Sequence, residues 1–202
     1  MNIRLCRCAE AAHCSFFMAP QIRHNSGQEL KVSDPRDFES LLHDLAGADP
    51  ALRKEAAAGL GKSADPRAVG PLVAALADEN SQVRDNVAFA LGELHDKRAT
   101  EPLVRALKDK EGWVRKSVAK ALGLLNDRRA EIPLWDALKD EAEWVRKSAA
   151  RSLGQIGTSK SLPALSQALK DPSILVRKAA QAAIDAIAAR GDRSGSFPAF
   201  KA

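Results

Sequence analysis

Tyrosine is absent from this chain of 202 residues, and aromatic residues make up only 4% of it. Its apolar content is mostly alanine, leucine and valine, the small and medium-sized side chains that closely packed helices favour. No stretch approaches the roughly 20 consecutive apolar residues of a membrane-spanning helix, so we expect no association with a membrane. The net charge is only +5, which is too little by itself to indicate nucleic acid as the partner.

Cysteine is missing from most of the chain. The three cysteines, Cys6, Cys8 and Cys14, all lie near its start, so disulfides do not hold the remainder together. A metal or redox cluster is the alternative use for them. Their spacing lacks the paired Cys-x-x-Cys geometry of zinc sites, however, and no second pair follows downstream. We therefore expect no metal site and no cofactor.

The two ends lack the periodicity of helices or strands. Residues 1–33 also lack the apolar core of a secretory signal, and their arginines only faintly resemble those of an organelle transit peptide. We interpret residues 1–33 as a disordered leader, or as an artefact if translation begins at Met18, and residues 191–202 as a flexible tail. Residues 34–190 then form one domain, which we expect to be monomeric and cytoplasmic.

What the chain does contain is a repeat of 31 residues. Four kinds of position recur at this interval. They are Pro71, Pro102 and Pro133; Leu76, Leu107, Leu138 and Leu169; Val83-Arg84, Val114-Arg115, Val145-Arg146 and Val176-Arg177; and Leu91-Gly92, Leu122-Gly123 and Leu153-Gly154. A repeat of this length indicates a solenoid, a class of fold that usually offers a binding surface rather than an active site.

Each repeat reads as a helix, a turn and a second helix. In one of them Asp65 can cap a helix and Pro66 suits its first turn, where no N–H is needed. Apolar residues then follow at helical spacing, and Ser81 is expected to cap the second helix. The turn at His95-Asp96 ends the unit. Counting by 31 predicts five such helix pairs between about residues 34 and 189.

Two further columns carry opposite charges. Aspartates occupy the turn within the repeat, and arginines follow six residues later in the second helix. The pairs are Asp78 and Arg84, Asp109 and Arg115, Asp140 and Arg146, and Asp171 and Arg177. We predict a structural ladder that bridges successive repeats, because each Arg has a matched Asp. The functional alternative is a row of anion-binding arginines.

The pattern Val-Arg-x-x-x-Ala-x-x-Leu-Gly, present as Val114-Arg115, Ala119 and Leu122-Gly123, resembles the HEAT-like repeats of the phycobilisome lyase family. The resemblance covers about three quarters of the chain. It implies an all-α fold, a right-handed α-α superhelix of about five helix-turn-helix repeats. Family members include subunits that attach or detach bilin chromophores on phycobiliproteins, whereas most related solenoids resemble adaptor scaffolds.

An enzymatic relative can be tested on the sequence. Deoxyhypusine hydroxylase shares this repeat type and binds two irons through repeated His-Glu pairs. Here His13, His24, His43 and His95 are not followed by Glu, which argues against a di-iron centre. No phosphate-binding loop, nucleophile elbow or other catalytic constellation stands out, so the sequence favours a protein without catalytic activity.

The resemblance also implies that second helices line a concave face. Three columns of those helices avoid the buried stripe: Gln82, Trp113, Trp144 and Leu175; Asp85, Lys116, Lys147 and Lys178; and Phe89, Lys120, Arg151 and Ala182. Tryptophan is unusual at such positions, and Trp and Arg are common at binding hot spots. The predicted partner-binding residues are Trp113, Trp144, Lys116, Lys147, Lys178, Lys120, Arg151 and Phe89.

Alternatives remain for these residues. Each Trp could instead fold over the boundary between repeats and complete the core, and the lysines could form an ordinary solvated face. Trp135, in a first helix, is expected to be packing or convex surface.

If the concave face is a binding groove, we expect it to bind an acidic, partly apolar protein or peptide. A special case is an accessory subunit acting on a bilin protein. The other class is nucleic acid, with cations on phosphates and Trp stacked on bases.

Overall fold

The computed structural model describes residues 37–191, which contain ten α-helices, four one-turn 3-10 helices and no strand. The helices form five consecutive pairs, which we call repeats 1 to 5. These are α1 (Phe38–Leu45) with α2 (Pro50–Lys62), α3 (Val69–Ala75) with α4 (Ser81–Glu93), α5 (Thr100–Ala106) with α6 (Gly112–Leu125), α7 (Glu131–Ala137) with α8 (Glu143–Ile156), and α9 (Leu162–Ala168) with α10 (Ile174–Ala189). The predicted solenoid of five helix pairs is thus confirmed.

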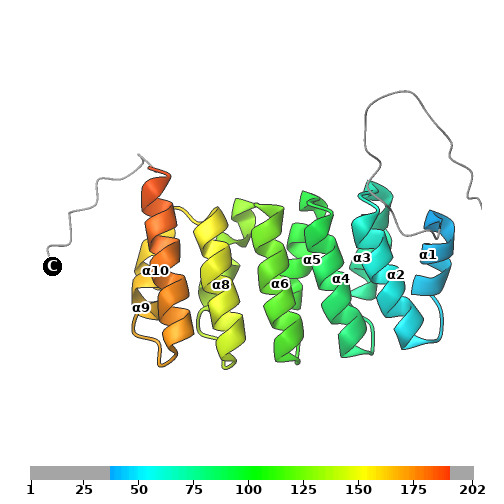
Figure 1. The fold of residues 1–202 in the computed structure, drawn as a ribbon, viewed down its shortest axis with the longest axis horizontal. Coiled ribbons are helices and arrows are strands. Elements are labelled where there is room, and N and C mark those ends of the chain that lie inside the picture. Colours follow the sequence, from blue (N-terminus) through cyan, green and yellow to red (C-terminus); the bar gives the residue numbers. More distant parts are fainter. Residues whose placement is uncertain (1–36, 192–202) are drawn as a thin grey trace, which may run out of the picture. The chain divides into compact units, whose positions relative to one another are not determined.

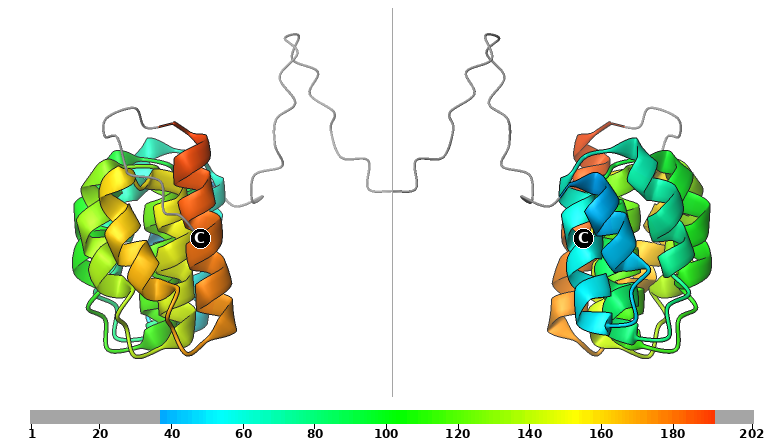
Figure 2. Two further views of the ribbon diagram at one scale, coloured as in Figure 1. Left: turned by 90° about the vertical axis from the view of Figure 1, so that its left-hand side faces the viewer. Right: turned by 90° about the vertical axis from the view of Figure 1, so that its right-hand side faces the viewer.

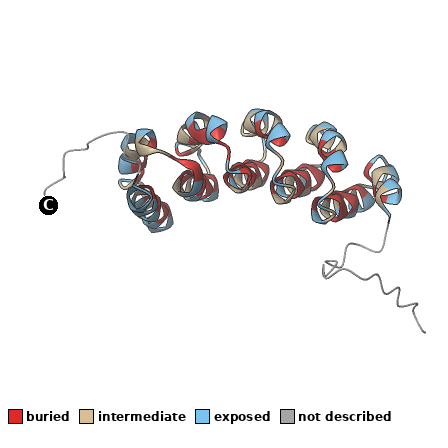
Figure 3. Ribbon diagram, turned by 90° about the horizontal axis from the view of Figure 1, so that it is seen from above, coloured by how far each residue is buried: buried red, intermediate tan, exposed pale blue. Residues whose placement is uncertain are grey.

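The ten helices lie in two rows (Figure 1). The second helices of successive repeats pack side by side from α2 to α10, and the shorter first helices form the other row, as the end-on views show (Figure 2). Seen from above, the rows of the repeat domain curve, with the second helices on the concave side (Figure 3). The expected placement of the second helices is therefore observed.

Polar residues begin the helices much as the sequence predicts. Asp65 accepts a hydrogen bond from the Arg67 backbone N–H at 2.9 Å, but the element it caps is a 3-10 turn, Pro66–Ala68, that leads into α3. The expected cap of α4 at Ser81 is wrong by one residue. Asn80 has the extended backbone of a cap, and its Oδ1 accepts from the Gln82 N–H at 2.9 Å. His95 ends repeat 2 in the left-handed conformation, with φ of 51°.

The core lies between the two rows and is built from the recurring apolar positions. Buried leucines come from both rows, Leu72, Leu103, Leu134 and Leu165 from the first helices and Leu60, Leu91, Leu122 and Leu153 from the second. Glycine lets neighbouring second helices approach closely. A Cβ added at Gly61 would lie only 2.7 Å from Ala90 Cα of the next repeat. The Leu-Gly column is therefore a packing feature, as predicted.

The solenoid has a polar face after α10. Ala88, Ala119 and Ala150 are fully buried in the internal repeats, but the same position of repeat 5 is the exposed Gln181. The position of the close-packed glycines is likewise occupied by the exposed Asp185 in repeat 5. The Gln181 side-chain amide donates to Asp185 at 2.8 Å. Ala180 and Ala183 are buried on the inner face of α10. Polar substitution at the stacking positions caps the repeat array.

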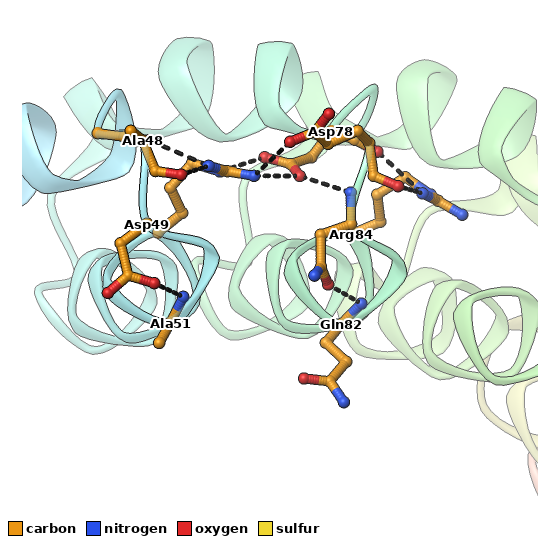
Figure 4. Close-up of polar contacts among 10 residues, drawn as sticks. Ala48, Asp49, Ala51, Asp78, Gln82 and Arg84 are labelled. Carbon is orange, nitrogen blue, oxygen red and sulfur yellow. Dashed lines mark hydrogen bonds and ion pairs between the residues drawn. The ribbon is translucent and has the colours of Figure 1, made fainter.

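A ladder between repeats is present as predicted, but the partners differ from the expected ones. Each of four arginines pairs with the aspartate 25 residues later, in the next repeat, and not with the side chain of the aspartate six residues before it. Arg84 donates from Nε and Nη2 to both carboxylate oxygens of Asp109 in the next repeat, at 2.6 and 2.9 Å. Its Nη1 donates to the backbone oxygen of Asp78 in its own repeat at 2.8 Å. Arg53, Arg115 and Arg146 make the same bidentate pairs with Asp78, Asp140 and Asp171. Figure 4 shows the first of these contacts, around Asp78 and Arg84. We call these four pairs the Asp–Arg ladder.

The ladder is largely removed from solvent. The side chains of Arg84 and Asp109 are only 7% and 11% exposed. Burial alone would raise the pKa of the Asp109 carboxyl, but hydrogen bonds from Arg84 and from the Glu111 backbone outweigh it and lower that pKa. Each aspartate therefore stays ionised, as the bidentate pair requires.

A second set of contacts joins the opposite ends of the repeats. Asp127 caps the 3-10 turn Arg128–Ala130 and accepts from the Arg129 side chain at 2.6 Å and from Thr100 Oγ1 of the preceding repeat at 2.9 Å. Arg129 also donates to the backbone oxygen of Lys97 in that repeat at 2.9 Å. The hydrogen bond from Arg129 is the largest effect that lowers the pKa of Asp127, to about 2.

Some expectations fall outside the described residues. These are the leader in residues 1–33, the use of Cys6, Cys8 and Cys14, a start at Met18, and the tail after Gly191. Within the described part, Trp135 is half-buried, and its Nε1 donates to Ser161 Oγ of the next repeat at 2.9 Å. Its interpretation as a packing residue is confirmed.

Candidate partner-binding surface

Exposed apolar side chains gather at the start of three successive second helices. Among residues 37–191, seven large apolar residues are exposed, and four of them lie in the first two positions of α6, α8 or α10. These four are Trp113 (56% exposed), Trp144 (47%), Ile174 (55%) and Leu175 (48%). Because Trp113, Trp144 and Leu175 share one repeat position, they form a continuous apolar stripe along repeats 3 to 5.

The two tryptophans of this stripe form a pair. Their rings are stacked, with centroids 6.3 Å apart and planes 9° apart. The ring of Trp144 lies over Gly112 of the preceding repeat, where an added Cβ would come within 3.2 Å of Trp144 Nε1. The rings do stack across the boundary between repeats 3 and 4, but each keeps about half of its surface in solvent and so does not complete the core. We call Trp113 and Trp144 the tryptophan pair.

Five cations follow the stripe on the same helices. Lys116 and Lys147 are half-buried one turn after the tryptophans, and Lys178 is exposed at the same position of α10. Lys120 and Arg151 lie a further turn along and are exposed. None of the five forms an ion pair with another described residue, in contrast to the arginines of the ladder. We call these five residues the basic face.

The corresponding positions of repeat 2 have a different chemistry. Gln82 takes the place of the tryptophans, Asp85 that of the first lysine and Phe89 that of the second cation. Phe89 is 41% exposed, and Lys120 Nζ of repeat 3 lies 5.9 Å from the centre of its ring. This distance is within the range of a cation–π contact. Phe89 thus borders the basic face, whereas Asp85 ends its positive charge.

A hollow of about 430 Å³ lies between α6 and α8 beyond the lysine row. Lys120 and Arg151 line it together with Leu124, Ser148, Ser152 and Gln155. The hydroxyl of Ser152 donates to the Ala119 backbone oxygen at 2.7 Å and thereby fixes its wall. The hollow has cations at its rim, so an anionic side chain of a ligand would be favoured there.

Sequence reasoning found the tryptophan pair and the basic face but omitted Leu175 of the stripe and Ile174 beside it. Leu175 shares the column of the tryptophans, whereas the column of Ile174 contains Ser81, Gly112 and Glu143 and gives no apolar signal. Two adjacent large apolar residues directly after the Asp-Pro-Ser turn of the last repeat were the available signal.

Residues 37–191 contain neither a candidate metal cluster nor a membrane-spanning helix. No group of three or more His, Cys, Asp or Glu side chains in residues 37–191 is arranged to hold a metal ion. In the same residues no helix is both long enough and apolar enough to cross a membrane.

Comparison with known proteins identifies the family. The sequence profile of HEAT repeats matches the chain three times, at residues 38–122, 70–148 and 103–188. Together these matches span most of the chain, so the protein belongs to the HEAT-repeat family. No curated protein matches the sequence significantly.

Solved structures support the same assignment. A chain from the complex of CpcE and CpcF of phycocyanin lyase from Nostoc sp. PCC7120 is 26% identical, with a TM-score of 0.69 over 83% of this chain and 70% of that one. A designed armadillo repeat protein in complex with the peptide (KR)4 is 24% identical, with a TM-score of 0.60 over 74% and 81%. An engineered protein is 25% identical, with a TM-score of 0.58 over 76% and 80%. The chain is thus a HEAT/armadillo-like solenoid similar to a chain of the phycocyanin lyase complex.

Proposed function

We propose that this protein is a non-catalytic scaffold whose concave face in repeats 3 to 5 binds an acidic, partly apolar segment of a partner protein. The observation that carries the proposal is the exposed, stacked tryptophan pair beside five cations that form no ion pair with another described residue. Solvent-facing positions of a helix are normally small or charged, so two half-exposed tryptophans there leave an apolar surface that a partner can cover.

The two parts of the surface would have separate roles. The tryptophan pair, extended by Leu175, offers a flat apolar area at the start of the helices, suited to an aromatic or aliphatic side chain. The basic face runs from there along α6 and α8, from Lys147 to Arg151 and the hollow beside it. A bound segment would therefore place an apolar residue against the rings and acidic residues about one and two turns of α8 away, roughly 5 to 11 Å along the helix.

A second candidate function is an accessory role in bilin attachment, with a chromophore-carrying protein as the partner. The similarity to a chain of the phycocyanin lyase complex favours it. The same concave face would hold the partner in this case. Adding a bilin and purified phycobiliprotein subunits separates the two candidates, because only an accessory subunit would change the yield of covalent chromophore, read as fluorescence on a denaturing gel.

The test of the scaffold function is affinity capture from native lysate with the full chain as bait. The matched bait carries Trp113→Ala and Trp144→Ala, and both are used with and without nuclease, with mass spectrometry as the readout. A protein captured by the wild type after nuclease treatment, and reduced at least about tenfold with the variant, supports the proposal. That ratio corresponds to about 1.4 kcal/mol of binding free energy.

Other outcomes have distinct meanings. Capture that disappears with nuclease would mean that the surface binds nucleic acid, with the lysines in contact with phosphates. In that event the affinity of the purified protein for a single strand should fall steeply with salt, by roughly 0.7 in log–log slope for each phosphate contact. Equal capture by wild type and variant would contradict the role of the tryptophan pair.

A further inference from the structure

The last arginine of the ladder column, Arg177, pairs with no aspartate side chain in residues 37–191. Its Nη1 donates to the backbone oxygens of Asp171 and Pro172 in its own repeat, at 2.6 and 2.9 Å. Arg146 makes the equivalent two bonds to Asp140 and Glu141, at 2.9 and 3.0 Å. The guanidinium of Arg177 is therefore held at its base in the same way as in the complete ladder pairs.

The outer edge of this guanidinium differs from the others. In the four ladder arginines, Nε and Nη2 donate to one carboxylate of the next repeat, for example Arg146 to Asp171 at 2.7 and 3.0 Å. No described residue accepts from Nε or Nη2 of Arg177. The half-buried guanidinium of Arg177 is thus oriented by two contacts from Nη1 to backbone oxygens. Its other two donors, Nε and Nη2, have no acceptor among the described residues.

We propose that Arg177 is a carboxylate-binding site at the C-terminal edge of the solenoid, and that its occupant is an aspartate- or glutamate-bearing turn of a partner protein. The four complete pairs in the same chain supply the template, because in each of them an identically held arginine binds an aspartate from a turn. A planar guanidinium with both outer donors free matches a carboxylate in bidentate geometry. Ile174 and Leu175, both about half exposed, lie on the preceding turn of α10 and add apolar contact area.

A second copy of this chain does not fit the site. The position of the ladder aspartate in repeat 1 is occupied by Gly47, so the edge of repeat 1 offers no carboxylate in register. In addition, Gln181 and Asp185 stand where close stacking needs Ala and Gly. Head-to-tail stacking of identical chains is therefore disfavoured on both counts, and a partner with its own acidic turn is favoured.

The donors of Arg177 are separate from the tryptophan pair and the basic face, although Leu175 borders both surfaces. Its probe is a blocked heptapeptide with the sequence of residues 169–175, which contains the ladder aspartate Asp171 in its natural turn. The matched control peptide has asparagine at that position. The side-chain Nε–H signals of the arginines, observed by NMR in the full chain, report which guanidinium meets the peptide.

We expect the aspartate peptide to shift the Arg177 Nε–H signal in a saturable way and to leave Arg84, Arg115 and Arg146 unchanged. The asparagine peptide should shift it at least about tenfold less at equal concentration. The variant with Trp113→Ala and Trp144→Ala should respond like the wild type, which separates this site from the concave surface.

Substitution provides the second arm. Arg177→Gln should leave the melting temperature within about 2 °C of the wild type and abolish the response to the aspartate peptide. Arg146→Gln removes an arginine from a complete pair and should clearly lower the melting temperature. Three results would overturn the proposal: equal shifts with both peptides, no shift at millimolar peptide, or an Arg177 signal that already resembles those of the ladder arginines in the free chain. The last would mean that residues of this chain occupy the site.

Discussion

Repeats 2 and 4 share one framework and differ on one face. Both contain the buried Val, Leu and Ala positions, and their arginines, Arg84 and Arg146, make the same bidentate pair with the following repeat. On the concave face, however, Gln82, Asp85 and Phe89 of repeat 2 correspond to Trp144, Lys147 and Arg151 of repeat 4. Residues that recur at every repeat hold the stack together, and those that change between repeats define what the surface can bind.

The largest expected effect comes from breaking the shared framework. Asp109→Ala removes the acceptor of both outer donors of Arg84 and leaves that charge nearly buried without a partner. We expect a loss of about 3–5 kcal/mol in the free energy of unfolding. Chemical denaturation followed by circular dichroism measures it. An unchanged midpoint would show that the ladder does not support the stack.

Close packing between second helices should rank next. Gly61→Ala places a Cβ 2.7 Å from the Ala90 backbone, so we expect a loss of up to about 3 kcal/mol. Gly70→Ala in α3 is the matched control, because a Cβ there meets nothing within 4 Å. It should be neutral or stabilise by about 0.5–1 kcal/mol through helix propensity. If both variants melted alike, the glycine column would not be a packing feature.

Acid should weaken the contacts of Asp127, which join neighbouring repeats at the ends opposite the Asp–Arg ladder. The pKa of Asp127 in the folded protein is about 2, below its ordinary value of 3.8. Its contribution, about 2 kcal/mol, is therefore fully present above about pH 4 and is lost as the pH falls towards 2. Urea denaturation of wild type and Asp127→Asn across this range measures it. The difference in unfolding free energy should narrow at low pH, and a constant difference would contradict the assignment.

Charge reversal on the differing face should alter binding rather than stability. Lys147→Glu with Arg151→Glu replaces two cations of repeat 4 that have no ion-pair partner among the described residues. The unfolding free energy should change by less than about 1 kcal/mol, since exposed charges contribute little. Capture of an acidic partner should fall. A binding loss matched by an equal loss of stability would mean that the variant disturbs the fold instead.

The features that depend on sequence period could be predicted, and those that depend on local geometry could not. A spacing of 31 residues reveals that an aspartate and an arginine recur and predicts a ladder between repeats. It did not reveal that each ladder arginine pairs with the aspartate of the next repeat, 25 residues later. The cap of α4 was misassigned because Asn80 and Ser81 are both good caps, and only the backbone conformation decides between them. The polar cap at Gln181 and Asp185 was overlooked for another reason: its meaning depends on the neighbour that those positions would contact.

The candidate surface shows the same division. The tryptophan column and the lysine row could be read from the alignment of repeats, and the family resemblance implied that the second helices line the concave side. The alignment could not decide whether the rings belong to the core or to the surface. That depends on Gly112, which leaves room for the Trp144 ring to lie flat beside Trp113. The free donor pair of Arg177 was also visible only as geometry, through the backbone contacts that fix it.

The most direct test of the account is the melting temperature of the variant with Trp113→Ala and Trp144→Ala, measured beside the wild type by circular dichroism. If the tryptophan pair belongs to a binding surface, helicity should be unchanged and the melting temperature should fall by only a few degrees. A large fall in melting temperature, comparable to that of Asp109→Ala, would contradict the account and would show that both rings stabilise the packing of the repeats.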